Sequence, residues 1–565
     1  MSSTLVADRH ADLALMAPYD PLPGSREELR TFAALQRGLS SMFGRVFPDP
    51  RAPRTVIVIP SMSLDHEELE KLSGASHYEE RFLCLLLLLR LPATHVVYVT
   101  SEPIAPAIVD YYLRLIPGVD AADARSRLTM LACHDTSAAP LTEKILARPA
   151  LLAAIRGLID DPAAAHLTCF TATALERTLA VRLGLPLYGC DPALAALGTK
   201  SGSRDVFHRA GVLTPPGYEH LRGDDDMIRA LVELKREHPS VCRAVIKLDE
   251  GFSGEGNATF SYEGAPSGPA LTDWVRAALP RSIRCVAAGE SWEEYSQEFA
   301  RMGGIVEAFI AGCELRSPSA QVRIDPLGLT QIISTHDQVL GGDTGQIYLG
   351  CTFPAESSCC PGMHDAARRV AAVLAGEGVV GRFGIDFVSK RVRTGWKQYA
   401  IEINLRKGGT THPYLTLQLL TDGAYDPATG LYRAGDGRPC FYVASDNVCD
   451  RAYTTLAPEA VISAAVRTGL QFNPASGTGV VFHMLGALQE FGKLGAVSIA
   501  PTRERARDLF AETVAMLRDE SARVTGHRDV RTCVRRERNR ARRYPSVPYR
   551  ARIGSRTPIG SYRQR

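Results

Sequence analysis

Two short apolar segments of the chain carry three oxygen-bearing side chains in a pattern that paired strands would bring together. The segments are Ile385-Asp386-Phe387-Val388 and Ala400-Ile401-Glu402-Ile403-Asn404. Because alternate residues of a strand share one face, Glu402 and Asn404 point the same way while the isoleucines turn towards a core. If the two strands are neighbours, Asp386 can face this pair. The chain must then fold around a sheet that carries the cluster on one face.

Two carboxylates and an amide suit a hard divalent cation. Mg²⁺ prefers oxygen ligands, keeps several waters and takes further ligands from phosphates. We therefore predict that Asp386, Glu402 and Asn404 bind Mg²⁺ in a magnesium–nucleotide site, where Mn²⁺ could take the same place. The alternative is a pair of strands with ordinary polar outward faces, and the sequence upstream favours the metal site.

An apolar strand upstream contains one lysine and is followed by glycines. Lys247 lies within the strand predicted at 245–248, and Gly251, Gly254 and Gly256 come shortly after it. A lysine in an apolar run is costly unless an anion meets it, and glycines allow the backbone to close over phosphates. The spacing is neither that of a Walker loop nor that of a Rossmann fingerprint, because the lysine precedes the glycines. A simple β-hairpin turn is the alternative.

A second strand, predicted from residue 304, ends in a glycine turn flanked by acids. The backbone of Phe309 and Ile310, beside Glu307, could pair with the edge of an adenine. Glu314, after the turn, could accept hydrogen bonds from ribose hydroxyls. The alternative is that both acids are solvated surface groups.

In this order the residues resemble the ATP-grasp carboxylate–amine ligases. That family has a lysine before a small lid subdomain, here Lys200, then a lid lysine with a glycine loop, two glutamates and the metal residues. More narrowly, segments 404–413 and 480–488 are similar to the pheganomycin-type peptide ligases of actinomycetes. The resemblance covers roughly residues 50 to 515. The chain departs from D-alanine ligases because it lacks their small-residue turn after the metal asparagine, so substrate contacts do not carry over from them.

The resemblance implies a mixed α/β fold: an ATP-grasp fold preceded by a parallel βαβ pre-ATP-grasp domain and followed by a C-terminal extension. It also implies ATP and Mg²⁺ as cofactors. The expected reaction converts an amino-acid or peptide carboxylate into an acyl phosphate, captures it with an amine and releases ADP and phosphate, in natural-product biosynthesis. Two alternatives are a silent nucleotide-binding scaffold and a small-molecule kinase on the same fold.

Such a reaction requires positioned cations more than covalent chemistry from the protein. Lys200 and Lys247 are expected on the α- and β-phosphates, and Arg406 on the γ-phosphate or acyl oxygens. Lys407 is a further candidate, although it points opposite to Arg406 in any extended run. Candidates for binding a substrate carboxylate are Arg316, Arg323 and Arg382. His412 and His483 are possible bases, with a structural hydrogen-bonding role as the alternative.

Four apolar segments near residues 55–59, 95–99, 128–131 and 166–170 alternate with helical stretches. That alternation predicts parallel βαβ units. We expect five parts in the chain: an N-terminal arm at 1–50, a pre-ATP-grasp domain at 51–190, an ATP-grasp domain at 191–425 with its lid at about 212–305, a ligase-specific region at 426–520 and a basic tail at 521–565.

Composition agrees with a cytoplasmic enzyme. A chain of 565 residues exceeds one ordinary core, and 45% hydrophobic with 22% charged residues is typical of globular proteins. The longest apolar run, 82–89, is too short to cross a bilayer and is expected in a helix, and residues 1–16 do not read as a signal peptide. The 13 cysteines are scattered without a Cys-x-x-Cys pair, which predicts reduced thiols. The expected partners are amino-acid or peptide substrates, and no membrane is expected. A homo-oligomer is a further possibility.

The net charge of +3 hides a basic C-terminus. Residues 531–565 contain twelve arginines and one glutamate, a net charge of +11, so the rest of the chain carries −8. This composition predicts a disordered tail that could bind nucleic acid nonspecifically through phosphates. The tail indicates little about the chemistry of the folded part.

Overall fold

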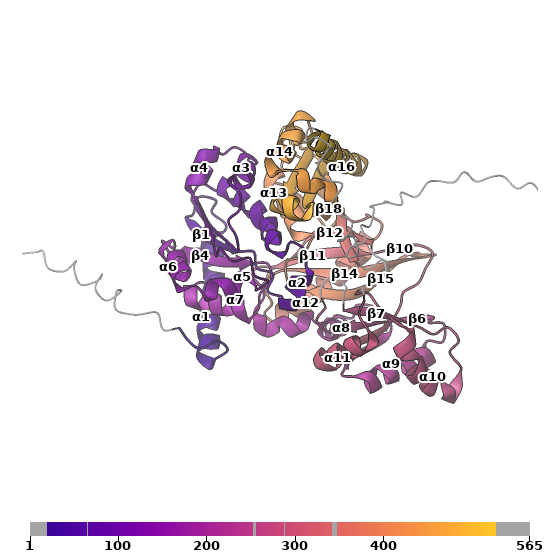
Figure 1. The fold of residues 1–565 in the computed structure, drawn as a ribbon. Coiled ribbons are helices and arrows are strands. Elements are labelled where there is room, and N and C mark those ends of the chain that lie inside the picture. Colours follow the sequence, from indigo (N-terminus) through magenta and orange to yellow (C-terminus); the bar gives the residue numbers. More distant parts are fainter. Residues whose placement is uncertain (1–19, 65, 252–255, 288, 342–346, 527–565) are drawn as a thin grey trace, which may run out of the picture.

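The structure is a computed structural model that describes residues 20–64, 66–251, 256–287, 289–341 and 347–526. Within these residues the strands form sheets of four, five, nine and two strands. In Figure 1 the four-stranded sheet and its helices lie on the left, and the five-stranded sheet lies at the lower right. The nine-stranded sheet lies above the five-stranded sheet and below the C-terminal helices.

The first lobe is built on a parallel sheet with strand order β3-β2-β1-β4. The strands are β1 (Arg54–Ile59), β2 (Thr94–Thr100), β3 (Leu128–Ala132) and β4 (Ala165–Cys169). Alternate residues of β1 enter different hydrophobic cores, with Val56 and Val58 on one face and Ile57 and Ile59 on the other. A strand covered on both faces is apolar throughout, which explains the continuous run in the sequence. The predicted parallel βαβ lobe is present.

The N-terminal segment that we expected as an arm contains α1 (Arg26–Val46), which packs into this lobe. Its buried residues recur at helical spacing, so one face can be buried. Glu28 is buried against Arg177, with 3.2 Å between its carboxylate and the guanidinium. For residues 26–46 the expectation of a separate arm was therefore wrong.

The apolar run at 82–89 lies in a 3-10 helix, η1 (Ala75–Arg90), instead of an α-helix. It packs between β2 and α13 (Thr411–Thr421), and most of its side chains are buried. The other helices of the lobe are α2 (His66–Lys71), α3 (Pro106–Arg114), α4 (Ala121–Ser126), α5 (Leu141–Leu146), α6 (Pro149–Gly157), η2 (Pro162–Ala164), α7 (Ala174–Leu183) and η3 (Pro192–Gly198).

The lid has its own antiparallel sheet and its own core. Its strands, in spatial order, are β5 (Gly217–Leu221), β9 (Gly304–Ala308), β6 (Arg243–Leu248), β7 (Asn257–Ser261) and β8 (Ile283–Cys285), with helices α9 (Asp224–Glu237), η4 (Gly268–Ala270), α10 (Leu271–Ser282) and α11 (Trp292–Met302). Strands β6 and β7 pair as a hairpin in which Lys247 lies opposite Asn257. Most of the glycine loop, including Gly254, lies outside the described residues. Three acids, Asp224, Asp225 and Asp226, lie in the first turn of α9, after the N-cap residue Gly223.

The central antiparallel sheet continues from the strands that carry Asp386 and Glu402 into the C-terminal region without a break. Its path is β10 (Leu315–Arg316), β14 (Gly381–Val392), β11 (Pro318–Ile324), β12 (Thr330–Gly341), β13 (Ile347–Phe353), β18 (Phe441–Cys449), β20 (Lys493–Ala500) and β19 (Gly479–His483), with β15 (Gly395–Asn404) paired to β14. The link is the pairing of β13 with β18. Residues after 426 therefore share a sheet with the strands that carry the acidic cluster.

Helices cover the central sheet and close the fold. They are α8 (Lys200–Arg209), α12 (Cys360–Gly376), η5 (Arg451–Thr455), α14 (Pro458–Arg467), η6 (Leu485–Ala487), α15 (Leu488–Phe491) and α16 (Arg503–Gly526); a small hairpin consists of β16 (Ala424–Asp426) and β17 (Leu431–Arg433). Among the residues that the structure describes, no helix has the length and apolarity needed to span a membrane.

A glycine in the first turn of α8 tests this packing. A Cβ on Gly202 would lie 1.9 Å from the backbone oxygen of Ala196, whereas one on Gly38 in α1 would meet nothing within 4 Å. We expect Gly202→Ala to lower the free energy of unfolding by about 1–3 kcal/mol through overpacking. Gly38→Ala should raise it by about 0.5–1 kcal/mol, since alanine favours a helix interior. Urea unfolding would measure both, and an unchanged midpoint for Gly202→Ala would contradict the packing described.

Candidate functional site

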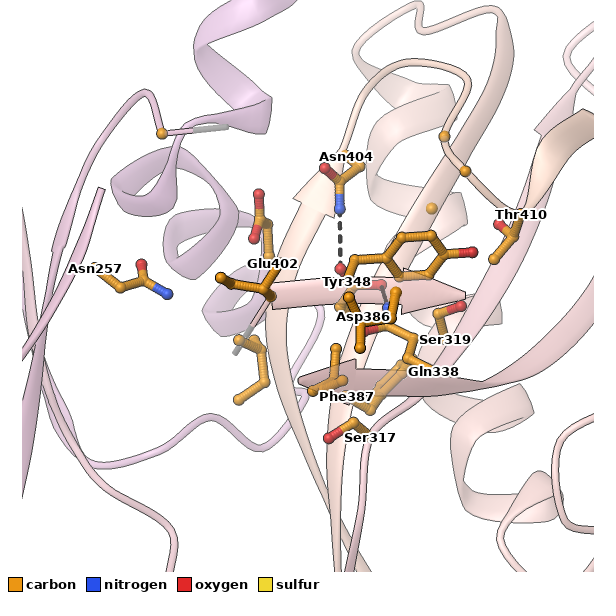
Figure 2. Close-up of a pocket in the computed structure, with 18 of the residues that line it drawn as sticks. Asn257, Ser317, Ser319, Gln338, Tyr348, Asp386, Phe387, Glu402, Asn404 and Thr410 are labelled. Atoms are coloured by element: carbon orange, nitrogen blue, oxygen red, sulfur yellow. Dashed lines mark hydrogen bonds between the residues drawn. The ribbon is translucent and has the colours of Figure 1, made fainter. Parts of the chain in front are cut away.

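A cavity of about 610 Å³ lies where the lid, the central sheet and the N-terminal lobe meet. Its walls include Lys247 of the lid, Asp386 and Glu402 of the central sheet, and Arg81 of η1. Figure 2 shows its side chains projecting from neighbouring strands. We describe it from the acidic cluster outwards.

The acidic cluster lies on the paired strands β14 and β15. Their register places Asp386 opposite Glu402 and Asn404 opposite Gly384. The Asn404 amide donates a hydrogen bond to Asp386 Oδ2 at 3.1 Å, and the Gln338 amide donates one to Oδ1 at 2.8 Å (Figure 2). The sequence pattern predicted the shared face of the first three side chains. It did not predict Gln338, which comes from β12.

The electrostatics of this cluster fit a divalent cation. Loss of water and the neighbouring Glu402 charge raise the pKa of Asp386 to about 7. Burial would also raise the pKa of Glu402, but the Lys200 ammonium, 2.6 Å from its carboxylate, together with Lys247 and Arg406 outweighs burial and lowers this pKa. Crowded carboxylates resist ionising together, and a bound cation relieves that repulsion. The oxygen donors of Asp386, Glu402 and Asn404 are the ligand types that Mg²⁺ prefers.

Lys200 is the first residue of α8 and is positioned by the end of a lid strand. Thr199 caps the helix by accepting a hydrogen bond from the Gly202 N–H. The Ser201 N–H donates to the Asp249 carboxylate at 2.8 Å, and the Lys200 N–H donates to the Asp249 carbonyl at 3.1 Å. Asp249 therefore ties the lysine to β6, a role that the sequence did not indicate.

The predicted lid lysine is buried and paired with the predicted hinge glutamate. Lys247 Nζ lies 2.6 Å from Glu307 Oε1, and Arg204 Nη1 lies 3.4 Å from the other carboxylate oxygen. Two cations therefore neutralise Glu307. Phe309 and Ile310, which follow it, line the cavity as expected for an adenine-binding hinge.

The two cations that follow Asn404, Arg406 and Lys407, point in different directions. Arg406 lines the cavity, and burial lowers the pKa of its guanidinium. Lys407 turns to the end of β4, where its ammonium donates to the Cys169 carbonyl at 2.5 Å and lies 3.3 Å from Thr168 Oγ1. This matches the alternation of an extended run and places Lys407 outside the cavity wall.

The predicted carboxylate-binding arginines are not brought to the acidic cluster. Arg316 pairs with Asp337 at 3.4 Å, and Arg323 donates to the Gln331 side chain at 2.9 Å. Arg382 lies opposite Arg323 on the adjacent strand, where burial lowers its pKa. Among the described residues that line the cavity, none of these three arginines is present. Their expected role as a substrate fork has no support in this arrangement.

Two other predicted nucleotide contacts, Glu314 and Gly256, are absent from the described cavity wall. Glu314 is exposed and is absent from the described cavity wall, so an acid near the ribose would have to come from elsewhere or from a movement of the lid. Gly256 begins the described part of the lid after the gap, and its carbonyl accepts a hydrogen bond from the Leu248 N–H at 2.9 Å.

His412 belongs to a buried network that includes His483 and Asp446. The two Nε2 atoms lie 3.0 and 2.7 Å from Asp446 Oδ1 and 3.1 Å from each other. Arg81 Nη1 lies 3.2 Å from the second oxygen of the same carboxylate. Burial lowers the pKa of His412 to about 4, which makes it a poor base at neutral pH. Three such atoms could ligate a metal, but Arg81 already neutralises Asp446, and we assign the group a structural role.

Comparison with known proteins now places the chain. An IQCH-like ATP-grasp family model matches residues 192–263 and 280–426, and a PGM1 C-terminal domain model matches residues 460–513. The L-propargylglycine–L-glutamate ligase of Streptantibioticus cattleyicolor is 34% identical over 472 residues, which are 82% of this chain and 94% of that protein. The chain belongs to the ATP-grasp ligases. The predicted fold class and enzyme class are therefore confirmed.

Two further similarities are weaker. IQ motif-containing protein H of Danio rerio is 26% identical over 412 residues, which cover 65% of this ATP-grasp ligase and 39% of that protein. Biotin carboxylase of Campylobacter jejuni has a TM-score of 0.49 at 13% identity, covering 84% of this chain and 95% of that one. The family assignment rests on the actinomycete ligase and the ATP-grasp model.

The acidic cluster can be tested with one isosteric change. If Glu402 ligates the metal, Glu402→Gln should lower turnover by about 100-fold or more and weaken Mg²⁺-dependent ATP binding. The melting temperature should fall somewhat, because Lys200 loses its charged partner, although the amide can still accept a hydrogen bond from its ammonium. The matched control is Glu314→Gln, at an exposed position outside the cavity, which should stay within about twofold of the parent. Glu402→Gln turnover within a few-fold of the parent would refute the assignment.

Proposed function

We propose that this ATP-grasp ligase activates the carboxylate of one amino acid or short peptide as an acyl phosphate and joins it to the amine of a second, releasing ADP and phosphate. The observation that supports this most is the convergence of opposite charges in one cavity. Lys200, Lys247 and Arg406 line it together with Asp386 and Glu402. Phosphoryl transfer to a carboxylate needs this combination of positioned cations and metal ligands.

Each group has a proposed role. Asp386, Glu402 and Asn404 would hold Mg²⁺, which neutralises charge between the β- and γ-phosphates when bound. Mn²⁺ could replace it. The two lysines would bind phosphate oxygens by exchanging their present glutamate partners for the nucleotide. Arg406 would then orient the γ-phosphate and the acyl oxygens beside the metal.

The adenine would lie against the lid hinge. Phe309 and Ile310 provide backbone groups and apolar surface there, and Glu307 holds Lys247 at the inner end. The γ-phosphate would then point towards Arg406 and the N-terminal lobe. The substrates would therefore enter between η1 and the central sheet.

The substrates are proposed from the relative's name together with the charges of the cavity. The relative is a ligase of L-propargylglycine and L-glutamate. We propose two α-amino acids, or an amino acid and a short peptide, as substrates here. A kinase on the same fold would stop at a phosphorylated product, and a silent scaffold has no need for Lys200, Lys247 and the metal cluster together.

Further proposals concern the whole protein. We divide it as predicted at residues 190, 425 and 520, with residues 26–46 counted in the first lobe, although β18, β19 and β20 extend the sheet of the ATP-grasp domain. The cysteines of the described residues are free, which supports a reducing, cytoplasmic location. A homo-oligomer and nonspecific nucleic-acid binding by the basic tail both stay predictions.

The first test is a screen of paired amino acids. We expect ATP-dependent phosphate release with L-glutamate and L-propargylglycine, or with close analogues, and a dipeptide detected by mass spectrometry. With the acid alone, hydroxylamine should trap the acyl phosphate as a hydroxamate. A stable phosphorylated product formed without any amine would identify a kinase instead. ATP binding without turnover across the screen would support a scaffold.

The second test separates the tail from the catalytic cavity. Deleting residues 532–565 should leave ATP-dependent phosphate release intact, because no proposed site residue lies beyond 493. Any binding to nucleic acid should be lost, and in the full chain it should weaken steeply with salt and show no sequence preference. Lost ligase activity at an unchanged melting temperature would show that the tail takes part in substrate capture.

A further inference from the structure

Arg81 is a buried arginine in the cavity wall that neither the metal cluster nor the nucleotide requires. It comes from η1 in the N-terminal lobe and is 5% exposed. Its guanidinium lies 4.5 Å from the ring centre of Tyr78 and 4.6 Å from that of Phe170. Aromatic contacts of this kind fix the plane of the guanidinium and leave its edges for hydrogen bonds.

Among the described residues, only some of the N–H donors of the Arg81 guanidinium have an acceptor. A guanidinium has five N–H donors. Among the described residues, Nη1 donates to Asp446 Oδ2 at 3.2 Å, Nε to the Tyr78 carbonyl at 3.4 Å, and Nη2 to the Met62 sulfur at 3.0 Å. The sulfur is a weak acceptor, and one further N–H on each Nη atom has no acceptor in the described part of the chain. Buried donors of this kind are costly unless a ligand meets them.

The residues around Arg81 are held firmly, so its position is set before any ligand arrives. Glu79 accepts hydrogen bonds from the Ser101 N–H and hydroxyl, both at 2.6 Å. Glu80 accepts from the Gly486 N–H at 3.1 Å, and a Cβ on Gly486 would lie 2.1 Å from the Glu80 carboxylate. These contacts fix η1 on both sides, and the histidine network fixes Asp446. Preorganised donors bind an anion with little loss of conformational entropy.

The local charge also favours an anion. Lys493 lines the same part of the cavity, where its ammonium donates to the Tyr78 hydroxyl at 2.7 Å. Arg81 pairs with one buried carboxylate, Asp446, whereas no ion pair joins Lys493 to a carboxylate among the described residues. Arg406 adds a further cation nearby, but its charge faces the acidic pair Asp386 and Glu402. An anion bound beside Arg81 would give Lys493 an oppositely charged partner.

We propose that Arg81, assisted by Lys493, binds the carboxylate of the amine-donating amino acid. The inference rests on the proposed ligase function and adds the recognition of its second substrate. Joining two amino acids consumes one carboxylate and one amine, so the amine donor keeps its own carboxylate throughout. The reactive carboxylate must lie beside Arg406 and the metal. The remaining carboxylate is the ligand for a guanidinium with a free edge, which can bind it through two N–H donors.

The test compares an amino acid with its carboxamide as the amine donor. L-Propargylglycine and its amide would be assayed with L-glutamate as the acid, and L-glutamate and its α-amide in the reverse pairing. In the parent, the amide should raise KM for the amine donor by about 10–100-fold, as expected for losing a charge-assisted pair. Arg81→Met should raise KM for the acid form similarly. In Arg81→Met the KM values for the acid and for the amide should then differ by less than about threefold.

Further variants keep the result interpretable. Arg81→Lys retains the charge beside Asp446 and should fold like the parent, but it should raise KM for the acid form by about tenfold because it cannot form the fork. Lys493→Met should also reduce the difference in KM between the acid and the amide, but by a smaller factor than Arg81→Met. The matched control is Arg90→Met, at the far end of η1, where the arginine pairs with Asp422. This variant should change neither KM for the amine donor nor the ratio of KM between the amide and the acid.

ATP binding separates this proposal from the general one. KM for ATP should stay within about twofold in every Arg81 variant. The ratio of KM for the amide to KM for the acid could stay as large in Arg81→Lys and Lys493→Met as in the parent. That result would overturn the carboxylate site but leave the ligase function supported. Absence of peptide formation by the parent would instead overturn the proposed function. Discrimination seen only for the activated amino acid would assign Arg81 to the other substrate and refute the proposal.

Discussion

The buried ion pairs between Lys200 and Glu402 and between Lys247 and Glu307 hold the cavity in its present form. Each pair has 2.6 Å between its charged atoms. Buried charges are tolerated only when they are paired, so these lysines need partners before a nucleotide arrives. Mg²⁺ and ATP bring the opposite charges and can replace both sets of partners together. We propose that the cavity is electrostatically complementary to a metal–nucleotide complex.

The fold explains how such distant residues meet. One continuous antiparallel sheet carries the acidic cluster on β14 and β15 and the Asp446 network on β18 and β19. The lid supplies Lys247 from a separate sheet, and the N-terminal lobe supplies Arg81 from η1. Each lobe contributes a charged group that would be costly to bury by itself.

Strand periodicity was sufficient to predict the shared face of Asp386, Glu402 and Asn404, because a period of two dictates side-chain direction in any strand. The parallel lobe and the ligase class were also predictable from ordered motifs. The proposed arginine fork was not, because Arg382 is near Asp386 and the other two arginines are near Glu314 only in sequence, whereas sheet pairing turns them towards other partners. Arg81 was missed because it lies far from the cluster in sequence. Like Lys247, it is a cation beside an apolar run, and that feature would have identified it.

The central claim is that the nucleotide complex replaces the lysine–glutamate pairs. The most direct measurement is a crystal structure with Mn²⁺ and a non-hydrolysable ATP analogue, with the metal located by anomalous scattering. The account predicts a metal about 2.0–2.3 Å from oxygens of Asp386, Glu402 and Asn404. Lys200 should leave Glu402 for a phosphate oxygen, and Lys247 should leave Glu307. A metal bound elsewhere, or both ion pairs unchanged beside the bound nucleotide, would contradict it.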